Sequence, residues 1–408
     1  MEDIDIKIAI IGAGVIGCSV AHELSQNFSG DIAVIEKNSK VTGENQSSRN
    51  SGVIHAGVYY PKDFGPLKAS LCVEGSRLLY EFCEKHNIAH KKTGKLIVAV
   101  NRMQEEYLED VLRIAGENKV SQVKKIDKND IKKYEPNVNG VAAVFIPDTG
   151  IIEPTNLVEK IKNLAEQRGV IFLADNKAVS IKPLDDGKGF LVKIASKNSE
   201  ETFKTKILIN CAGLYSDEVA KMINPESLYE IEPVKGEAAK FYSSKRENLE
   251  MNKMNVYPVP LGYYLNGERA DVSFSEFNSL FKKHKLTKSV GAHLTPTFEF
   301  EKGGYKISDT VTIGPVYSKP ENREDYTHTR DENYYRDAVK PFFPGIETED
   351  ISLNQTGIRA KLKNYYDFVI ERDKKYFNAL NLIGIDSPGL SSCLAIAKYV
   401  KELLKDSV

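Results

Sequence analysis

The sequence predicts an α/β fold with two domains, one built on a parallel sheet and the other on a mainly antiparallel sheet. Three observations support this. A short apolar run at residues 8–11 leads into closely spaced glycines and a helical pattern, which is typical of a buried parallel strand. Further strands and helices follow in alternation. Between residues 231 and 345 the pattern changes to irregular alternating strands and turns, and 408 residues are enough for two domains or one large elaborated one.

The glycines at positions 12, 14 and 17 predict a Rossmann-type turn that binds a dinucleotide. Gly12 allows a tight turn, Gly14 lets a pyrophosphate approach the backbone, and Gly17 lets the helix pack on the sheet. The helix N-terminus adds free N–H groups. Glu36 ends the second strand about 20 residues later, where a carboxylate binds a ribose and disfavours NADP. A glycine-rich turn that binds nothing would leave Glu36 unexplained.

Composition narrows the classes of function. A formal net charge of -1 argues against bulk nucleic-acid binding. No apolar stretch approaches the length of a membrane span, and the acidic residues 1–5 form neither a signal nor a transit peptide. The cysteines are scattered, which favours buried thiols in a reducing cytoplasm over disulfides or a metal site. They are Cys18, Cys72, Cys83, Cys211 and Cys393.

The elements after the first βαβ unit are predicted from periodicity and turn signals. Helices are expected over residues 67–85, 105–118 and 154–168, and from 387 to 404. Strands are expected over residues 94–100, 170–173, 179–181, 190–194, 206–213 and 380–386, with a turn at 185–187. The polar loop at residues 38–50 contains hydroxyls and an arginine that suit a diphosphate, although composition alone favours an ordinary loop.

Residues 261–289 contain an amphipathic helical pattern within the antiparallel region. Its apolar positions are Phe274, Phe277, Leu280 and Phe281, and Lys282, Lys283, Lys285 and Lys288 follow. A basic amphipathic element can touch an anionic membrane or a redox partner. A helix that simply covers the sheet is the more common use of such a stripe.

Several segments together resemble one known family. The most specific are SSRNSGVIHAGVYY at residues 47–60 and LKASLCVEG at residues 67–75, beside the glycine turn and Glu36-Lys37. Shorter matches lie at residues 94–100, 135–137, 149–151, 211–217, 257–260, 357–360 and 387–389. They resemble the D-amino-acid-oxidase-type FAD-dependent oxidoreductases, and within these are most similar to L-2-hydroxyglutarate dehydrogenases and oxidases. The 261–289 segment departs from the family as an insertion, which weakens the transfer of substrate identity.

The resemblance implies a glutathione-reductase-like FAD-binding domain and a substrate domain. We expect the first at residues 1–85, 147–225 and 346–408, and the second at 86–146 and 226–345. No second glycine motif follows a later strand, so one dinucleotide, FAD, is expected. The implied cofactor-binding residues are Gly12, Gly14, Val15, Ile16, Gly17, Glu36, Lys37, Ser47, Ser48, Arg49, Asn50, Ser51, Val179, Ala212, Gly213, Gly357, Pro388, Gly389, Leu390 and Ser391.

His55 and Arg359 are the implied catalytic residues. A histidine near neutrality suits removal of a hydroxyl proton, although a histidine that only hydrogen-bonds near the flavin is the alternative. Arg359 offers a planar fork for the anionic end of a substrate. Tyr60 and Lys361 are weaker candidates for the same pocket. The helix N-terminus at residues 388–391 would stabilise negative charge on the reduced flavin.

The expected reaction is FAD-dependent oxidation of a small anionic secondary alcohol, with L-2-hydroxyglutarate converted to 2-oxoglutarate as the leading case. The main alternative is oxidation of sn-glycerol 3-phosphate to dihydroxyacetone phosphate. An amine or amino-acid oxidase and a non-catalytic flavoprotein are less favoured. Oxygen, a quinone and a carrier protein remain open as electron acceptors. The expected location is cytoplasmic, with peripheral contact at the inner membrane face through residues 262–289 as an option.

Overall fold

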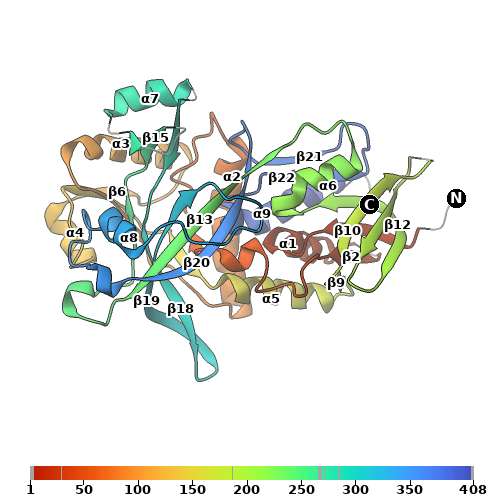
Figure 1. Ribbon diagram of the computed structural model, residues 1–408, viewed down its shortest axis with the longest axis horizontal. Coiled ribbons are helices and arrows are strands. Elements are labelled where there is room, and N and C mark those ends of the chain that lie inside the picture. Colours follow the sequence, from red (N-terminus) through yellow and green to blue (C-terminus); the bar gives the residue numbers. More distant parts are fainter. Residues whose placement is uncertain are drawn as a thin grey trace.

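Two large sheets organise the molecule (Figure 1). The computed structural model describes residues 4–28, 30–185, 187–264, 269–270, 272–283 and 285–405. Within these ranges the strands form two eight-stranded and two three-stranded sheets. The first large sheet lies at the end of the molecule where both termini are found, and the second lies at the opposite end (Figure 1).

The first sheet contains the predicted parallel strands. Its order is β10-β11-β12-β1-β2-β9, and β22 pairs with both β12 and β21. The pairs that join β9, β2, β1, β12 and β22 are parallel, and β10 and β11 form an antiparallel extension. The bounds are β1 (Ile6–Ile11), β2 (Ile32–Ile35), β9 (Ile171–Leu173), β10 (Lys177–Pro183), β11 (Phe190–Ala195), β12 (Glu200–Asn210), β21 (Val369–Arg372) and β22 (Ala379–Ile383). The first and second of the predicted parallel strands are thus confirmed to within about two residues, and the last, predicted over 380–386, ends three residues earlier, at Ile383. Asp186 of the predicted 185–187 turn lies outside the described residues.

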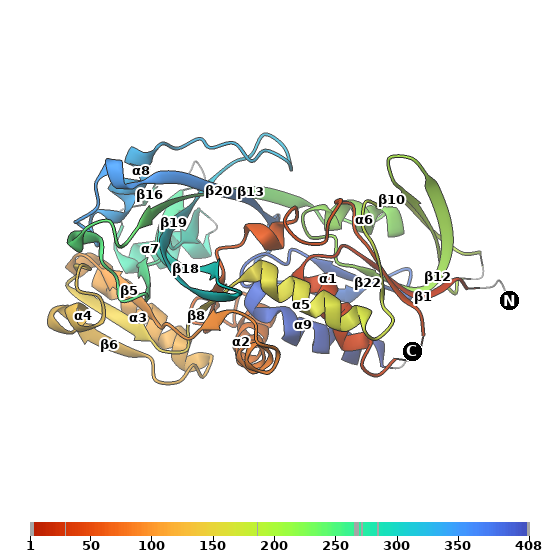
Figure 2. The same ribbon diagram turned by 90° about the horizontal axis from the view of Figure 1, so that it is seen from below.

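Helices cover both faces of this sheet. One face carries α1 (Val15–Leu24), α5 (Pro154–Glu166) and α9 (Gly389–Leu404), which lie side by side in Figure 2, and α2 (Pro66–His86) packs on α9. The other face carries α6 (Ser216–Ile223), whose Val219 and Ile223 are buried against the sheet. The crossing of α2 and α9 is close: a Cβ on Gly75 would lie 2.4 Å from the carbonyl oxygen of Ser391, so only glycine fits there.

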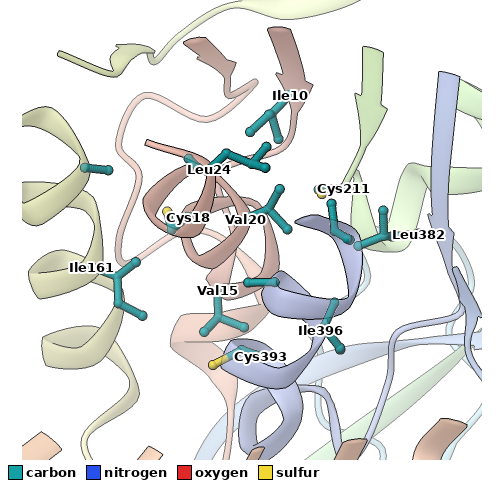
Figure 3. Packing of buried hydrophobic residues seen from close by; sticks show 14 of the residues in the cluster. Ile10, Val15, Cys18, Val20, Leu24, Ile161, Cys211, Leu382, Cys393 and Ile396 are labelled. Carbon is teal, nitrogen blue, oxygen red and sulfur yellow. The ribbon is translucent and has the colours of Figure 1, made fainter. Parts of the chain in front are cut away.

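The core beneath α1 joins residues from both ends of the sequence (Figure 3). Cys18 of α1, Cys211 after β12 and Cys393 of α9 lie among aliphatic side chains such as Val20 and Ile396. All five cysteines are free and buried. They behave as small apolar residues of the core.

The second sheet is antiparallel except at one pair. Its order is β20-β13-β19-β18-β14-β5-β7-β6, with β14 and β5 parallel. The bounds are β5 (Lys95–Ala99), β6 (Lys124–Asp127), β7 (Ala142–Ile146), β13 (Ile231–Tyr242), β14 (Asn255–Pro258), β18 (Leu294–Glu301), β19 (Gly304–Ser318) and β20 (Ser352–Leu362). Strand β20 lies in the segment 346–408 that was assigned to the FAD-binding domain, yet it pairs with β13. Residues 352–362 thus lie in the second sheet, and the chain re-enters the first sheet at β21.

Helices and short elements complete the second half. The helices are α3 (Arg102–Glu117), α4 (Lys128–Tyr134) and α8 (Glu332–Val339), and 3₁₀ turns occur at η1 (Gln46–Arg49), η2 (Gly213–Tyr215), η3 (Glu247–Leu249) and η4 (Thr348–Asp350). A small sheet of β3 (Val53–Ile54), β8 (Gly150–Ile152) and β4 (His90–Lys91) links segments far apart in the sequence.

The predicted insertion forms a small layer on α3. It contains β15 (Leu261–Tyr264), β16 (Arg269–Ala270), α7 (Phe274–Lys282) and β17 (Leu286–Ser289). Phe277 is 2% exposed, and its ring lies 5.6 Å from that of Tyr107 on α3. The apolar stripe of α7 thus packs inside the protein, as expected for a covering helix. Residues 265–268, 271 and 284 of this segment lie outside the described residues.

Candidate active site

A cavity of about 1410 Å³ opens between the two large sheets. One wall is formed by the carboxyl ends of β1, β2, β12 and β22, and the other by β13, β19 and β20. The carboxyl edge of an open parallel sheet is the usual place for a ligand. Of the predicted cofactor residues, all line this cavity except Gly17, Ser48 and Val179.

The glycine turn has the geometry of a dinucleotide cradle. Gly12 has φ +103°, and a Cβ there would lie 2.4 Å from the carbonyl oxygen of Cys211. Gly17 serves packing instead of the cavity, because its Cβ would lie 1.9 Å from the carbonyl oxygen of Gly12. Gly14 caps α1 without a side-chain hydrogen bond, which leaves the start of the helix open toward the cavity. Such an end attracts phosphate.

Glu36 lies at the cavity wall with its carboxylate fixed. Oε2 accepts the backbone N–H of Ala13 at 2.8 Å, and Oε1 accepts that of Asn38 at 2.9 Å. Burial raises the pKa of this carboxyl above its ordinary value. Each oxygen keeps a lone pair for a ribose hydroxyl, so Glu36 fits the predicted role. Lys37 lines the cavity beside it and pairs with Glu324 at 3.2 Å.

The loop around η1 connects the two walls. Ser47 Oγ accepts the N–H of Val15 at 2.9 Å, which fixes the loop to the glycine turn. Arg49 stacks on Tyr326 at 3.9 Å and donates from Nη1 to the carbonyl of Thr356 at 3.1 Å. Asn50 and Ser51 also line the cavity.

Two predicted cofactor residues point elsewhere. Ser48 Oγ accepts the N–H of Gly43 at 2.7 Å, so its side chain holds the loop together. Val179 is 38% exposed on β10 and does not line the cavity, whereas its neighbours Lys177 and Ala178 do. The pairing of β10 with β11 has a β-bulge between Ala178 and Ser180, and this irregularity at Val179 breaks the alternation that would put Val179 on the same face as Lys177.

The remaining predicted cofactor residues border the cavity at three places. Ala212 and Gly213 follow β12, and a Cβ on Gly357 of β20 would lie 3.1 Å from Arg49 Cβ. The start of α9 supplies the last group: Pro388, Gly389, Leu390 and Ser391. Ser391 Oγ accepts the backbone N–H of His55 at 2.8 Å, so this helix end also positions His55.

His55 presents a neutral imidazole to the cavity. Its ring lies 6.3 Å from the rings of both Tyr59 and Tyr60, and makes no hydrogen bond to any described residue. Burial holds the pKa of His55 well below its usual value, and Lys95, His293 and Arg359 lower it further. A neutral imidazole with a free nitrogen can accept a proton.

Arg359 is held by a carboxylate that the sequence analysis did not single out. Its Nη2 donates to Asp386 Oδ2 at 2.7 Å, and Lys68 Nζ donates to Oδ1 of the same carboxylate, also at 2.7 Å. The two cations leave this group with a net positive charge. Asp386 is buried, and the nearby cations Lys68 and Arg359 outweigh burial and hold its pKa below the ordinary value. The Arg359 side chain is 33% exposed, with Nη1 unpaired among the described residues, so it can bind an anion.

Tyr60 and Lys361 both line the cavity. The Tyr60 hydroxyl lies 3.2 Å from Ser387 Oγ, and burial raises its pKa, which keeps it protonated. Lys361 of β20 makes no ion pair with a described residue. Asp386, Lys68 and the aromatic wall of Tyr257 and His293 also border the cavity and were not predicted from the sequence. The signal for Asp386 was a charged residue at the end of an apolar strand.

In the described ranges no group of three His, Cys, Asp or Glu side chains is arranged to hold a metal ion. None of the helices described is both long and apolar enough to cross a membrane.

This fold and cavity define an oxidoreductase that works with a bound dinucleotide. The chain belongs to the DAO family of FAD-dependent oxidoreductases, which matches residues 7–403. It is 37% identical to the mitochondrial L-2-hydroxyglutarate dehydrogenase of Caenorhabditis elegans, over 96% of this chain and 92% of that protein. It is 29% identical to a glycerol 3-phosphate dehydrogenase of Caloramator mitchellensis, over 98% and 74%. The fold resembles dithionite-reduced L-alpha-glycerophosphate oxidase of Mycoplasma pneumoniae with FAD bound, with a TM-score of 0.80, 24% identity, and coverage of 98% and 94%.

Proposed function

We propose that the protein oxidises L-2-hydroxyglutarate to 2-oxoglutarate. The observation that carries the proposal is the pairing, in one cavity, of a neutral His55 with a cationic Arg359 whose Nη1 is unpaired among the described residues. A substrate with both a secondary alcohol and a carboxylate could interact with both side chains, the alcohol with His55 and the carboxylate with Arg359. The relative at 37% identity bears that substrate in its name.

The residues of the chain divide the work of the reaction. Arg359, fixed by Asp386, binds a carboxylate and sets the position of the carbinol carbon. His55 takes the hydroxyl proton on its free ring nitrogen. FAD, when bound, supplies the two-electron acceptor for the hydride that leaves the same carbon. The alcohol thus loses one proton and one hydride and becomes a ketone.

We infer that FAD is held along the first wall of the cavity. Glu36 would bind the ribose, the start of α1 with Ser47 the pyrophosphate, and the start of α9 the flavin end. The domain division belongs to the same proposal, with residues 1–85, 147–225 and the segment after β20 forming the FAD-binding part.

Oxidation of sn-glycerol 3-phosphate is the second candidate. A phosphate also suits an arginine, and the relative from Caloramator mitchellensis carries that activity in its name. Its lower identity, 29% against 37%, ranks it second. An amino-acid oxidase ranks below both.

The electron acceptor and the location complete the proposal. Oxygen, a quinone or a carrier protein would take the electrons from the reduced enzyme. Five free, buried thiols support a reducing, cytoplasmic compartment.

Peripheral contact with an anionic membrane would use the exposed lysines Lys282, Lys283 and Lys285, because the apolar stripe of α7 is packed inward. Co-sedimentation with anionic vesicles, compared with neutral vesicles, tests that contact.

The proposed substrate is tested by anaerobic bleaching of the flavin. Protein with bound FAD is mixed without oxygen with L-2-hydroxyglutarate, and separately with D-2-hydroxyglutarate and sn-glycerol 3-phosphate. We expect rapid loss of the visible flavin absorbance with the L-hydroxy acid and little with the other two. Bleaching by glycerol 3-phosphate alone would establish the second candidate, and bleaching by none of them would contradict both.

A further inference from the structure

Lys95 is a buried lysine without a counter-charge beside the active site. It is the first residue of β5 and is 1% exposed. Among the described residues, no carboxylate pairs with it and nothing accepts a hydrogen bond from its Nζ. Its partners are aromatic: Nζ lies 3.6 Å from the centre of the Tyr257 ring and 5.0 Å from that of Tyr59. Burial of a lone ammonium is costly, and cation–π contacts offset only part of that cost.

The same rings form the wall of the substrate side of the cavity. Tyr257 stacks on His293 with ring centres 3.8 Å apart and planes at 8°, and both line the cavity together with Tyr59. Lys95 does not line it. The ammonium therefore lies directly behind an aromatic wall, close enough to His55 to lower the pKa of that imidazole.

No neighbour neutralises the charge of Lys95. The titratable groups that face it are Cys72 from α2, Tyr59 and His55 from the segment after β3, Tyr257 from β14, and His293 before β18. Burial raises the pKa of Cys72, Tyr59 and Tyr257 and lowers that of both histidines, so all five are neutral near pH 7. Lys95 is thus the one group in this set that can be charged there.

We propose that Lys95 is a positioning residue for the substrate, and that binding of a dicarboxylate in the cavity draws a proton onto it. The inference rests on the proposed function, because it gives the second carboxylate of 2-hydroxyglutarate an electrostatic partner distinct from Arg359. The partner acts through the ring of Tyr257, without direct contact.

The acid–base behaviour of Lys95 supports this assignment. Burial lowers its pKa from 10.5 to about 7, so the side chain is largely neutral in the free enzyme at pH 8. An anion placed in the cavity favours the charged form and raises the pKa. Binding at pH 8 must then be accompanied by proton uptake.

A matched control lies on the same sheet. The Lys235 side chain of β13 is also 1% exposed, but its Nζ forms an ion pair with Asp325 at 2.8 Å, so its charge is already balanced. It does not line the cavity. Lys235→Met removes a buried lysine of the same size without touching the aromatic wall.

The test uses glutarate, a dicarboxylate without an oxidisable hydroxyl, and the enzyme with bound FAD. Binding is followed by the change in the flavin spectrum, and proton uptake by phenol red in weakly buffered solution at pH 8. We expect on the order of one proton taken up per glutarate bound by the wild type and by Lys235→Met. Lys95→Met should take up almost none and bind about tenfold more weakly at pH 7. Lys95→Arg, with a permanent charge, should bind glutarate without proton uptake.

Each outcome decides the inference. Full proton uptake by Lys95→Met, or unchanged affinity, would overturn it, as would a failure of glutarate to perturb the flavin of the wild type. A variant that does not fold is recognised by loss of FAD, and Lys95→Arg then carries the test. If L-2-hydroxyglutarate does not bleach the flavin but glutarate binds with uptake that depends on Lys95, the proposed substrate fails and the inference stands.

Discussion

Asp386 binds Arg359 through one carboxylate oxygen at 2.7 Å, and its side chain is only 4% exposed. The other oxygen binds Lys68 of α2, also at 2.7 Å. Arg359 on β20, the proposed anion-binding residue, is therefore oriented by a residue between β22 and α9, which belong to the opposite wall of the cavity. An arginine fixed in this way loses little conformational freedom when it binds a substrate.

Replacement of Asp386 by Asn should weaken substrate binding more than the chemical step. Arg359 and Lys68 would lose their shared counter-charge, and Arg359 would no longer be held in one position. We expect KM for L-2-hydroxyglutarate to rise about tenfold or more with a smaller change in kcat. The control is Asp350→Asn, which removes a buried carboxylate that likewise pairs with two cations, Lys245 and Arg246, away from the cavity. An equal rise in KM in both variants would contradict the positioning role.

Loss of the guanidinium of Arg359 should have the larger effect. Arg359→Met removes the proposed anchor and leaves Asp386 with Lys68 alone, so we expect kcat/KM to fall about 100-fold to 1000-fold. Arg359→Lys should recover part of this, because charge returns without the planar fork. Steady-state kinetics measure the change. Arg77→Met on the exposed face of α2, where Arg77 pairs only with Glu81, should leave kcat/KM unchanged.

If His55 accepts the substrate proton, the rate of flavin reduction should fall in acid and stay constant in the neutral range. Its depressed pKa keeps the imidazole neutral, and able to take a proton, throughout the neutral range. The rate should therefore stay level from about pH 7 upward and fall only well below pH 6.5. Stopped-flow measurement of anaerobic reduction tests this. His55→Gln should lower the rate about 100-fold to 10000-fold, and a rate equal to that of the wild type would assign proton removal to another group.

The same histidine should affect stability toward acid. Because the pKa of His55 in the folded chain lies below its unfolded value, the unfolded chain binds more protons below pH 6.5, and stability falls as the pH drops. Urea unfolding of wild type and His55→Gln at pH 7.5 and pH 5.5 should show a smaller loss in the variant. The control is Glu81→Gln, which changes an exposed carboxylate that pairs with Arg77. This variant should lose as much stability between pH 7.5 and pH 5.5 as the wild type does.

Glu36 should control retention of the cofactor. Glu36→Gln keeps the shape but removes the charge that accepts the N–H of Ala13 and would bind the ribose. We expect the Kd for FAD to rise about tenfold to 100-fold. Fluorescence of released flavin on dilution reports it. Glu166→Gln, at an exposed pair with Lys162 on α5, is the control and should retain FAD like the wild type.

The local features of the fold were predictable because they are encoded over short stretches. The β1–α1–β2 unit, the helix from Gly389 and the helix within residues 261–289 all follow from periodicity and glycine placement. The place of β20 in the second sheet was not predicted, because pairing between strands more than 100 residues apart in sequence leaves no local signal.

The residues of the candidate site likewise include some that local motifs predict and others that only the folded chain brings together. Gly12, Gly14, Ser47 and Ser51 line the cavity, as their local motifs predict, whereas Gly17 and Ser48 do not. Asp386, Lys68 and Lys95 were missed because their environments are created by strands and helices that meet only in the folded chain. Val179 shows a finer limit: a strand can be located from sequence, but the β-bulge at Val179, which breaks the alternation of side chains there, leaves no clear signal in the sequence.

The packing of α9 on α1 and α2 has a consequence for how the protein is made. The first βαβ unit emerges early from the ribosome, but the core beneath it includes Ile396 and Cys393 from the last helix. Until translation has passed nearly 400 residues, the apolar face of α1 has no cover on that side, and the pocket that would receive the flavin lacks the start of α9. This core therefore stays incomplete until α9 has been synthesised, and we expect FAD to be held only after α9 has packed on α1 and α2.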